Sequence, residues 1–145
     1  MRATSVLTSG QWPASREVGH IVADFEQRFR RRFLFDTQAG WSFLLDLREP
    51  VRLRHGDGLV LEDGGIVRVE ALAESLVEIT AFDDRSITRI AWHLGNRHIP
   101  VQVMRNTLRI RAEPVTMDLV ERLGGDLAPL TAPFDPEPGA YEQHG

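Results

Sequence analysis

The stretch Trp92-His93-Leu94-Gly95-Asn96-Arg97-His98-Ile99-Pro100 marks the end of a helix and holds two of the five histidines of the chain. The residues that lead into it repeat apolar side chains at the i, i+3, i+4, i+7 spacing of one helical face: Ile87, Ile90, Ala91 and Leu94. The start of this helix is favoured by three capping or acidic residues, Asp83, Asp84 and Ser86. Gly95-Asn96 suits the end, because both residues tolerate the left-handed conformation. The sequence therefore predicts a helix that ends at Leu94.

The two histidines are five positions apart, so on a continued helix they would point about 140° apart. This spacing is poor for chelating one ion, and a second ligand would have to come from elsewhere. A second copy of the chain is the simplest source. The alternative is that His93 is a helix-end histidine stabilised by the macrodipole and His98 is an ordinary loop residue.

The segments around this helix predict a mixed α/β domain over residues 74–134. A strand is expected at 76–82, a strand pair at 101–104 and 108–111, and a last strand at 127–130. Pro114 is favoured as the first residue of a second helix, which Gly124-Gly125 would end. The resulting order βαββαβ predicts a ferredoxin-like domain.

Residues 1–73 predict an all-β domain, so the fold class is α+β. Strands are expected at 4–7 and 41–47, the second with an apolar centre that indicates burial on both faces. Asp63-Gly64-Gly65 separates two short strand signals and predicts a tight hairpin. Many short strands with turn glycines favour a small sandwich or barrel-like domain.

The run His-Leu-Gly-Asn-Arg-His, followed by Ile99 and Pro100, resembles the signature of the UreE family of urease accessory nickel chaperones. The resemblance covers roughly residues 15–134 and implies the same two-part layout. It implies a homodimer in which His98 of each protomer holds Ni²⁺, while His93 and Asn96 support the site or the fold. It further implies delivery of the metal to the urease accessory GTPase and the urease apoprotein complex.

Residues 135–145 are rich in proline, glycine and acid and predict a flexible tail. The tail contains His144. Many members of the resembled family end in a histidine-rich tail that gathers extra nickel, so His144 is a candidate additional ligand. The alternative is an idle terminal histidine.

A basic stretch beside Phe29 and Phe33 contains four arginines: Arg28, Arg30, Arg31 and Arg32. Strand parity predicts that Arg28, Arg30 and Arg32 share one face, which is either solvated or docks a partner. An RNA-binding or ribosome-assembly adaptor is the alternative function, since arginine and aromatic faces serve phosphates and bases. The family resemblance favours a protein partner, as its N-terminal domain is thought to contact the urease activation machinery.

Composition restricts both the possible metal ligands and the possible classes of function. The 145 residues include no cysteine, so a metal site must use imidazole, carboxylate or water, which suits nickel, copper or zinc. A net charge of −4 disfavours a general nucleic-acid role. No run approaches the ~20 apolar residues of a membrane span, and the start lacks a signal-peptide core, which predicts a cytoplasmic protein. No catalytic motif stands out, so an enzyme is not expected.

Overall fold

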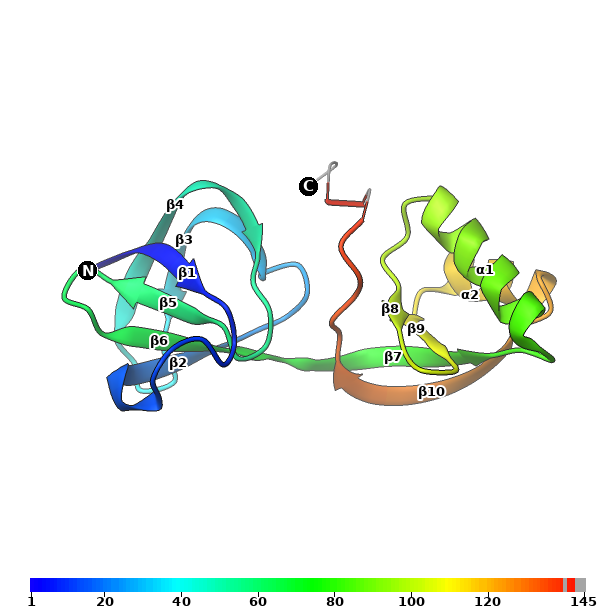
Figure 1. The fold of residues 1–145 in the computed structure, drawn as a ribbon, viewed down its shortest axis with the longest axis horizontal. Coiled ribbons are helices and arrows are strands. Elements are labelled where there is room, and N and C mark those ends of the chain that lie inside the picture. Colours follow the sequence, from blue (N-terminus) through cyan, green and yellow to red (C-terminus); the bar gives the residue numbers. More distant parts are fainter. Residues whose placement is uncertain (140, 143–145) are drawn as a thin grey trace. The chain divides into compact units, whose positions relative to one another are not determined.

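The computed structural model describes residues 1–139 and 141–142, and the chain divides into two compact units, Met1–Leu72 and Ala73–Gly145 (Figure 1). The N-terminal unit is rich in strands, and the C-terminal unit mixes strands and helices. Among the described residues, no helix has the length and apolar character that a bilayer crossing would need.

The N-terminal unit is a six-stranded sheet in the order β2-β6-β5-β1-β4-β3. Its elements are β1 (Arg2–Leu7), a 3-10 turn η1 (Ala14–Arg16), β2 (Glu17–Ala23), β3 (Phe29–Asp36), β4 (Ser42–Arg52), β5 (Gly58–Leu61) and β6 (Ile66–Ala71). The predicted hairpin at residues 63–65 is confirmed, since β5 pairs antiparallel with β6 and Gly64 has a φ of 91°. Gly64 takes the positive φ that this tight turn requires.

Burial along β4 alternates instead of covering both faces as predicted. Phe43, Leu45 and Leu47 are buried, whereas Leu44 is half-buried. The buried side of β4 carries an aromatic cluster in which the Phe43 ring lies 5.9 Å from Phe35 and 6.0 Å from Trp41, centroid to centroid. The alternation is that of a sheet with one face on a core.

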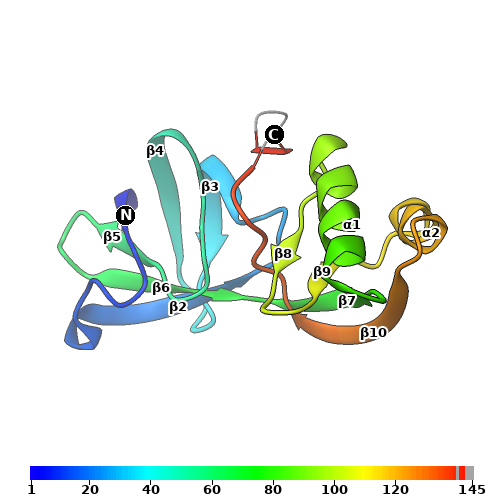
Figure 2. The same cartoon turned by 45° about the vertical axis from the view of Figure 1, so that its right-hand side comes forward.

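The C-terminal unit is a four-stranded sheet in the order β10-β7-β9-β8, with every neighbouring pair antiparallel. Its elements are β7 (Ala73–Thr80), α1 (Asp84–Asn96), β8 (Gln102–Val103), β9 (Leu108–Arg111), α2 (Pro114–Arg122) and β10 (Asp126–Pro133). Ile90 of α1 and Val120 of α2 share one buried cluster with Val77 and Ile79 of β7. Both helices therefore cover the same face of this sheet (Figure 2).

Helix α1 begins as the sequence predicts. Asp83 is its N-cap, and the carboxylate accepts a hydrogen bond from the backbone N–H of Ser86 at 2.8 Å. Hydrogen bonds from the Ser86 side chain and then from its backbone lower the pKa of Asp83. These bonds favour the charged carboxylate.

We expect Asp83→Ala to lower the melting temperature of the protein at neutral pH. Asp83→Asn should lower it much less, because asparagine also caps helices. The folded-state pKa is lowered, so the contribution of the charged cap is present above the unfolded pKa of about 3.9 and is lost as pH falls through the folded value. Thermal melts of the three proteins at neutral and strongly acidic pH measure this. A wild-type advantage over Asp83→Asn that grows on acidification would contradict it.

Candidate metal centre

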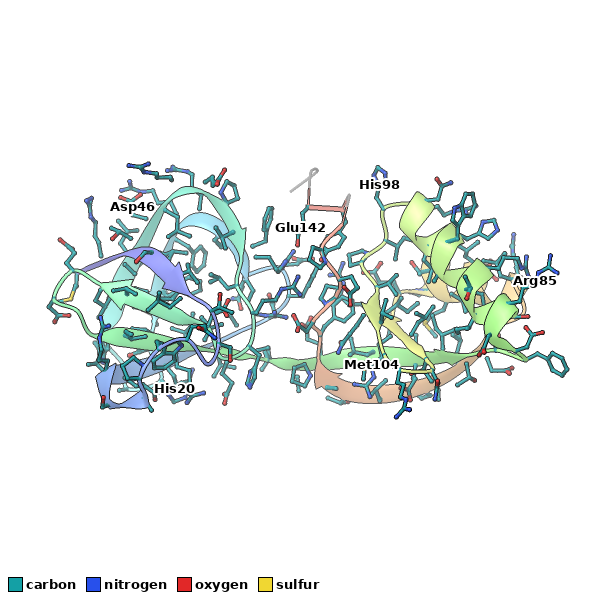
Figure 3. The ribbon with its side chains drawn as sticks, viewed as in Figure 1. His20, Asp46, Arg85, His98, Met104 and Glu142 are labelled. Carbon is teal, nitrogen blue, oxygen red and sulfur yellow. The ribbon has the colours of Figure 1, made fainter. Side chains whose placement is uncertain are left out.

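His98 is the second residue beyond the end of α1, and this helix continues two residues past the predicted stop at Leu94 (Figure 3). Gly95 and Asn96 are helical, and the left-handed residue is His98, with a φ of 57°. The prediction that Gly95-Asn96 would supply the left-handed turn is therefore wrong. The physical reason is that asparagine and glycine permit this conformation without requiring it, whereas the hydrogen bonds of the helix end decide where it falls.

Two backbone hydrogen bonds fix this helix end. The N–H of Ile99 donates to the carbonyl of Leu94 at 3.1 Å, and the N–H of His98 donates to the carbonyl of Gly95 at 3.0 Å. This is the Schellman pattern, in which the residue holding the left-handed conformation is most often glycine. A side chain at that position costs roughly 1–2 kcal/mol. Among the described residues, His98 is the single non-glycine with a positive φ.

Helix α2 ends in the same way with a different residue. The N–H of Gly124 donates to Glu121 at 3.0 Å, the N–H of Gly125 donates to Val120 at 3.0 Å, and Gly124 has a φ of 90°. The two helix ends differ in that α2 carries glycine where α1 carries histidine. The imidazole is thus kept at a position where its backbone conformation is unfavourable, a pattern found at functional sites.

A cavity of about 130 Å³ adjoins His98. Its wall is formed by the end of α1 on one side and by the C-terminal segment on the other, with Ala91, Gly95, His98, Glu137, Pro138 and Tyr141 among the lining residues. This cavity could not be predicted from the sequence, because its two walls are roughly forty residues apart in the chain. Its lining includes one histidine and one glutamate, His98 and Glu137.

The C-terminal segment is held against β8 up to Glu137. Phe134 and Pro136 are buried, and the N–H of Glu137 donates to the carbonyl of Val101 at 2.8 Å. The hydroxyl of Tyr141 donates to the carbonyl of Glu137 at 2.7 Å. These contacts differ from the flexible tail expected over residues 135–145, since the composition did not reveal that Phe134 and Pro136 would pack. His144 lies outside the described residues.

His93 faces a different environment from His98. Its ring lies 5.0 Å from that of Trp92 in an edge-to-face arrangement, and Trp92 is 63% exposed. Among the described residues that line the cavity, His93 and Asn96 do not occur. The structure therefore does not bring the two histidines of the motif together. Trp92 was missed as a surface feature, although it falls outside the apolar stripe of its helix.

The arginine stretch does not form the single face that parity predicted. Arg28 is fully buried and precedes β3, where its guanidinium donates to the carbonyls of Ala23 and Leu53, both at 3.2 Å. Its assignment to a partner-binding surface is therefore corrected: it joins the end of β2 to the residue that follows β4. The β3–β4 register also shifts between Arg30 and Arg32, which breaks the alternation.

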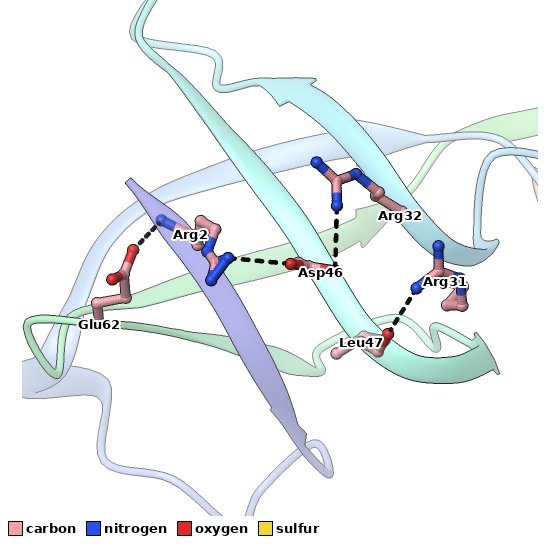
Figure 4. A network of polar contacts seen from close by, with 6 residues as sticks. All are labelled: Arg2, Arg31, Arg32, Asp46, Leu47 and Glu62. Carbon is pink, nitrogen blue, oxygen red and sulfur yellow. Dashed lines mark hydrogen bonds and ion pairs between the residues drawn. The ribbon is translucent and has the colours of Figure 1, made fainter.

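The remaining arginines of the stretch lie on β3. Arg32 and Arg2 reach the Asp46 carboxylate from the strands on either side of β4, at 3.8 and 3.2 Å (Figure 4). Arg31 donates to the carbonyl of Leu47 at 3.4 Å. The Arg30 guanidinium lies 4.6 Å from the centre of the Phe33 ring. In these two pairs the arginine side chains are 50% and 57% exposed and Asp46 is 20% exposed, so solvent screening keeps their contribution to stability small.

The described residues of a single chain include few side chains placed to bind a metal ion. Within residues 1–139 and 141–142, no group of three histidine, aspartate or glutamate side chains is placed to hold an ion. His98 supplies one imidazole at an exposed helix end, next to the cavity. Imidazole nitrogen suits nickel, copper and zinc.

Comparison with known proteins gives consistent matches over nearly the whole chain. Residues 3–72 match the family model "UreE urease accessory protein, N-terminal domain", and residues 74–145 match the corresponding C-terminal domain. The chain is 49% identical over 97% of its length to a "Urease accessory protein UreE" of Rhodopseudomonas palustris (strain BisB18), and 46% identical over 99% to that of Bradyrhizobium sp. (strain ORS 278). It spans only 66% and 68% of the length of these two relatives. It is also 44% identical to the Beijerinckia indica protein of this name, over 100% of the chain and 83% of that relative.

Proposed function

The chain belongs to the UreE family of urease accessory proteins, and from this premise we propose that it is a homodimeric chaperone that carries Ni²⁺ for assembly of the urease metallocentre. The observation that carries the proposal is His98, an imidazole kept in a left-handed conformation at an exposed helix end. Imidazole is a good ligand for Ni²⁺, and Zn²⁺ or Cu²⁺ would compete for the same nitrogen.

The proposed site is shared by two copies of the chain. A closed dimer places the same residue of both protomers at its two-fold axis, so one His98 from each contributes an imidazole to a single ion. His144 is a further proposed ligand from the C-terminal end. Few protein ligands, with water in the remaining positions, leave the ion exchangeable, which a carrier needs in order to transfer its cargo to a receiver with more ligands.

We propose the ferredoxin-like topology for the C-terminal unit. The element order β7-α1-β8-β9-α2-β10 and the antiparallel sheet order β10-β7-β9-β8 support it. In this arrangement the end of α1 is fixed by a buried core, because Ile90 and Leu94 are fully buried. The position of His98 is thereby tied to a rigid part of the unit.

The proposed receivers are the urease accessory GTPase and the urease apoprotein complex, in the cytoplasm. We assign their docking to Arg30, Arg31 and Arg32 on β3, a strand at the end of the six-stranded sheet. The contacts favour a protein partner over RNA. Base stacking needs open aromatic faces, whereas Arg30 lies over Phe33, and Arg52 lies 3.9 and 5.1 Å from the ring centres of Phe25 and Phe29.

Calorimetric titration of the purified protein with Ni²⁺ at pH 7.5 and pH 5 tests the proposal. We expect one tight ion per dimer at pH 7.5. At pH 5 we expect affinity at least tenfold weaker, with proton release on binding, because protons compete with metal for imidazole nitrogen. Sedimentation with and without Ni²⁺ should show metal-enhanced association at the higher pH only. Binding as tight at pH 5 as at pH 7.5 would indicate carboxylate ligands and refute the histidine-centred site.

A further inference from the structure

The last described residues of the chain, from Phe134 onward, form a strap that is fixed to β8. Phe134 itself is fully buried. The backbone N–H of Asp135 donates to the side-chain carbonyl of Gln102 at 3.1 Å, and the N–H of Glu137 donates to the carbonyl of Val101 at 2.8 Å. The strap therefore runs back along β8 instead of leaving the unit where β10 ends (Figure 2).

The strap leads to the cavity that His98 lines. The hydroxyl of Tyr141 donates to the carbonyl of Glu137 at 2.7 Å, and the N–H of Glu142 donates to the carbonyl of Gly139 at 3.1 Å, so the chain turns back on itself. Three residues of the strap, Glu137, Gly139 and Tyr141, line the cavity together with His98. The chain that continues beyond the strap therefore starts beside the proposed metal centre.

This attachment changes how far the next residues must search for an ion. His144, a proposed ligand, follows Glu142 by two positions, which span at most ~7 Å. Without the strap contacts it would be tethered to Pro133, the end of β10, by eleven residues with a root-mean-square span of about 18 Å. Because effective concentration falls as the searched volume grows, the attachment raises it roughly tenfold.

We infer that the strap is a positioning element of the metal centre, held on β8 by Gln102 and by the Val101 carbonyl so that His144 reaches the ion bound by His98. The inference rests on the proposed function, because it takes both histidines as ligands. Gln102 acts only through the strap and is a positioning residue. A strap that is already ordered before metal arrives lowers the entropy cost of adding the further ligand.

The test uses a release variant that combines Gln102→Ala with Glu137→Pro. The first change removes the side-chain acceptor and the second removes the backbone donor. Glu137→Ala is the matched control, since it loses the same carboxylate and keeps the N–H. Chymotrypsin cleaves after aromatic residues, so cleavage after Tyr141 in metal-free protein reports detachment of the strap. We expect cleavage at least about fivefold faster in the release variant and less than about twofold changed in the control.

Nickel affinity is then measured by calorimetry in a double-mutant cycle with His144→Ala. We expect release of the strap to weaken nickel binding about tenfold when His144 is present, and by less than about twofold in the His144→Ala background. The Glu137→Ala control should change affinity by less than about twofold. A strap that only stabilises the fold would weaken both backgrounds equally.

The outcomes separate this inference from the proposed function. Equal losses in the two backgrounds, or wild-type nickel affinity in a protein whose strap is released, would overturn the inference. Wild-type affinity in His144→Ala would overturn it as well and leave the His98 site intact. If chymotrypsin does not cut the release variant faster, Phe134→Ala, which removes the buried ring, decides the question by the same measurements. Nickel binding that is equal in wild type and His98→Ala would remove the proposed function and this inference with it.

Discussion

Replacement of His98 by alanine or by glycine should weaken the tightest nickel binding by more than about 100-fold, beyond the 10–100-fold expected when a supporting residue around a metal is lost. The proposed site draws one imidazole from each protomer, so a single substitution removes both. His93→Ala should reduce affinity by about tenfold or less, because His93 packs against Trp92 away from the cavity. Isothermal titration at pH 7.5 measures all three variants. Equal losses at His93 and His98 would contradict the assignment.

The same two variants of His98 should differ in stability. Glycine adopts a φ near 57° without steric cost, whereas alanine, like histidine, has a Cβ and keeps that cost. We expect His98→Gly to stabilise the metal-free protein by about 1 kcal/mol, or roughly 4–8 °C in melting temperature for a unit of this size, and His98→Ala to change it little. Gly124→Ala, at the equivalent end of α2, is the control and should destabilise. A less stable His98→Gly would show that the imidazole contributes to packing.

A substitution that shortens a buried side chain in one unit should destabilise that unit without destabilising the other. Phe43→Ala removes a fully buried ring from the N-terminal unit and should cost about 3–5 kcal/mol there. We expect this variant to keep its nickel affinity, because His98 belongs to the other unit. Calorimetric melts resolve the transitions, and titration of the folded remainder with Ni²⁺ tests the site.

Ile90→Ala is the matched variant in the C-terminal unit, where it should cost about 2–5 kcal/mol. It should also weaken nickel binding, since Ile90 lies in the helix that positions His98. A single transition that both substitutions lower equally would mean that the units unfold together. Loss of nickel binding in folded Phe43→Ala would show that the N-terminal unit contributes to the site.

The sequence predicted the existence of α1 and missed the details of its end. The apolar stripe through Ile90 and Leu94 indicated the helix because periodicity reports which face is buried, and both residues are fully buried. The left-handed residue was assigned to Gly95-Asn96 because residue preferences are averages over many helix ends. The hydrogen bonds from His98 and Ile99 decide the position here, and they depend on how the chain continues into β8.

The arginine stretch shows a second limit of sequence reasoning. The prediction that alternate arginines share a face assumed a regular strand. The β3–β4 pairing is irregular, because Arg30 lies opposite Val51 whereas Arg32 lies opposite Asp46. Pro50 lies in the intervening part of β4 and cannot donate to a ladder, which places it at an irregularity. The proline was visible in the sequence, whereas the strand it would oppose was not. The cavity beside His98 was unpredictable for a similar reason, since it needs the tertiary fold to bring its walls together.

The pairing of β7 with β10 sets when the C-terminal unit can fold. These are its first and last strands, and they pair at every position from Asp126 opposite Thr80 to Pro133 opposite Ala73. A ladder between segments so far apart in the chain closes a long loop before it gains any contact, which slows folding. During synthesis the sheet stays incomplete until residue 133 has left the ribosome. His98 is therefore synthesised before the strand that completes the sheet beneath its helix. A nascent chain that encountered metal at that stage would not yet have a folded site to bind it.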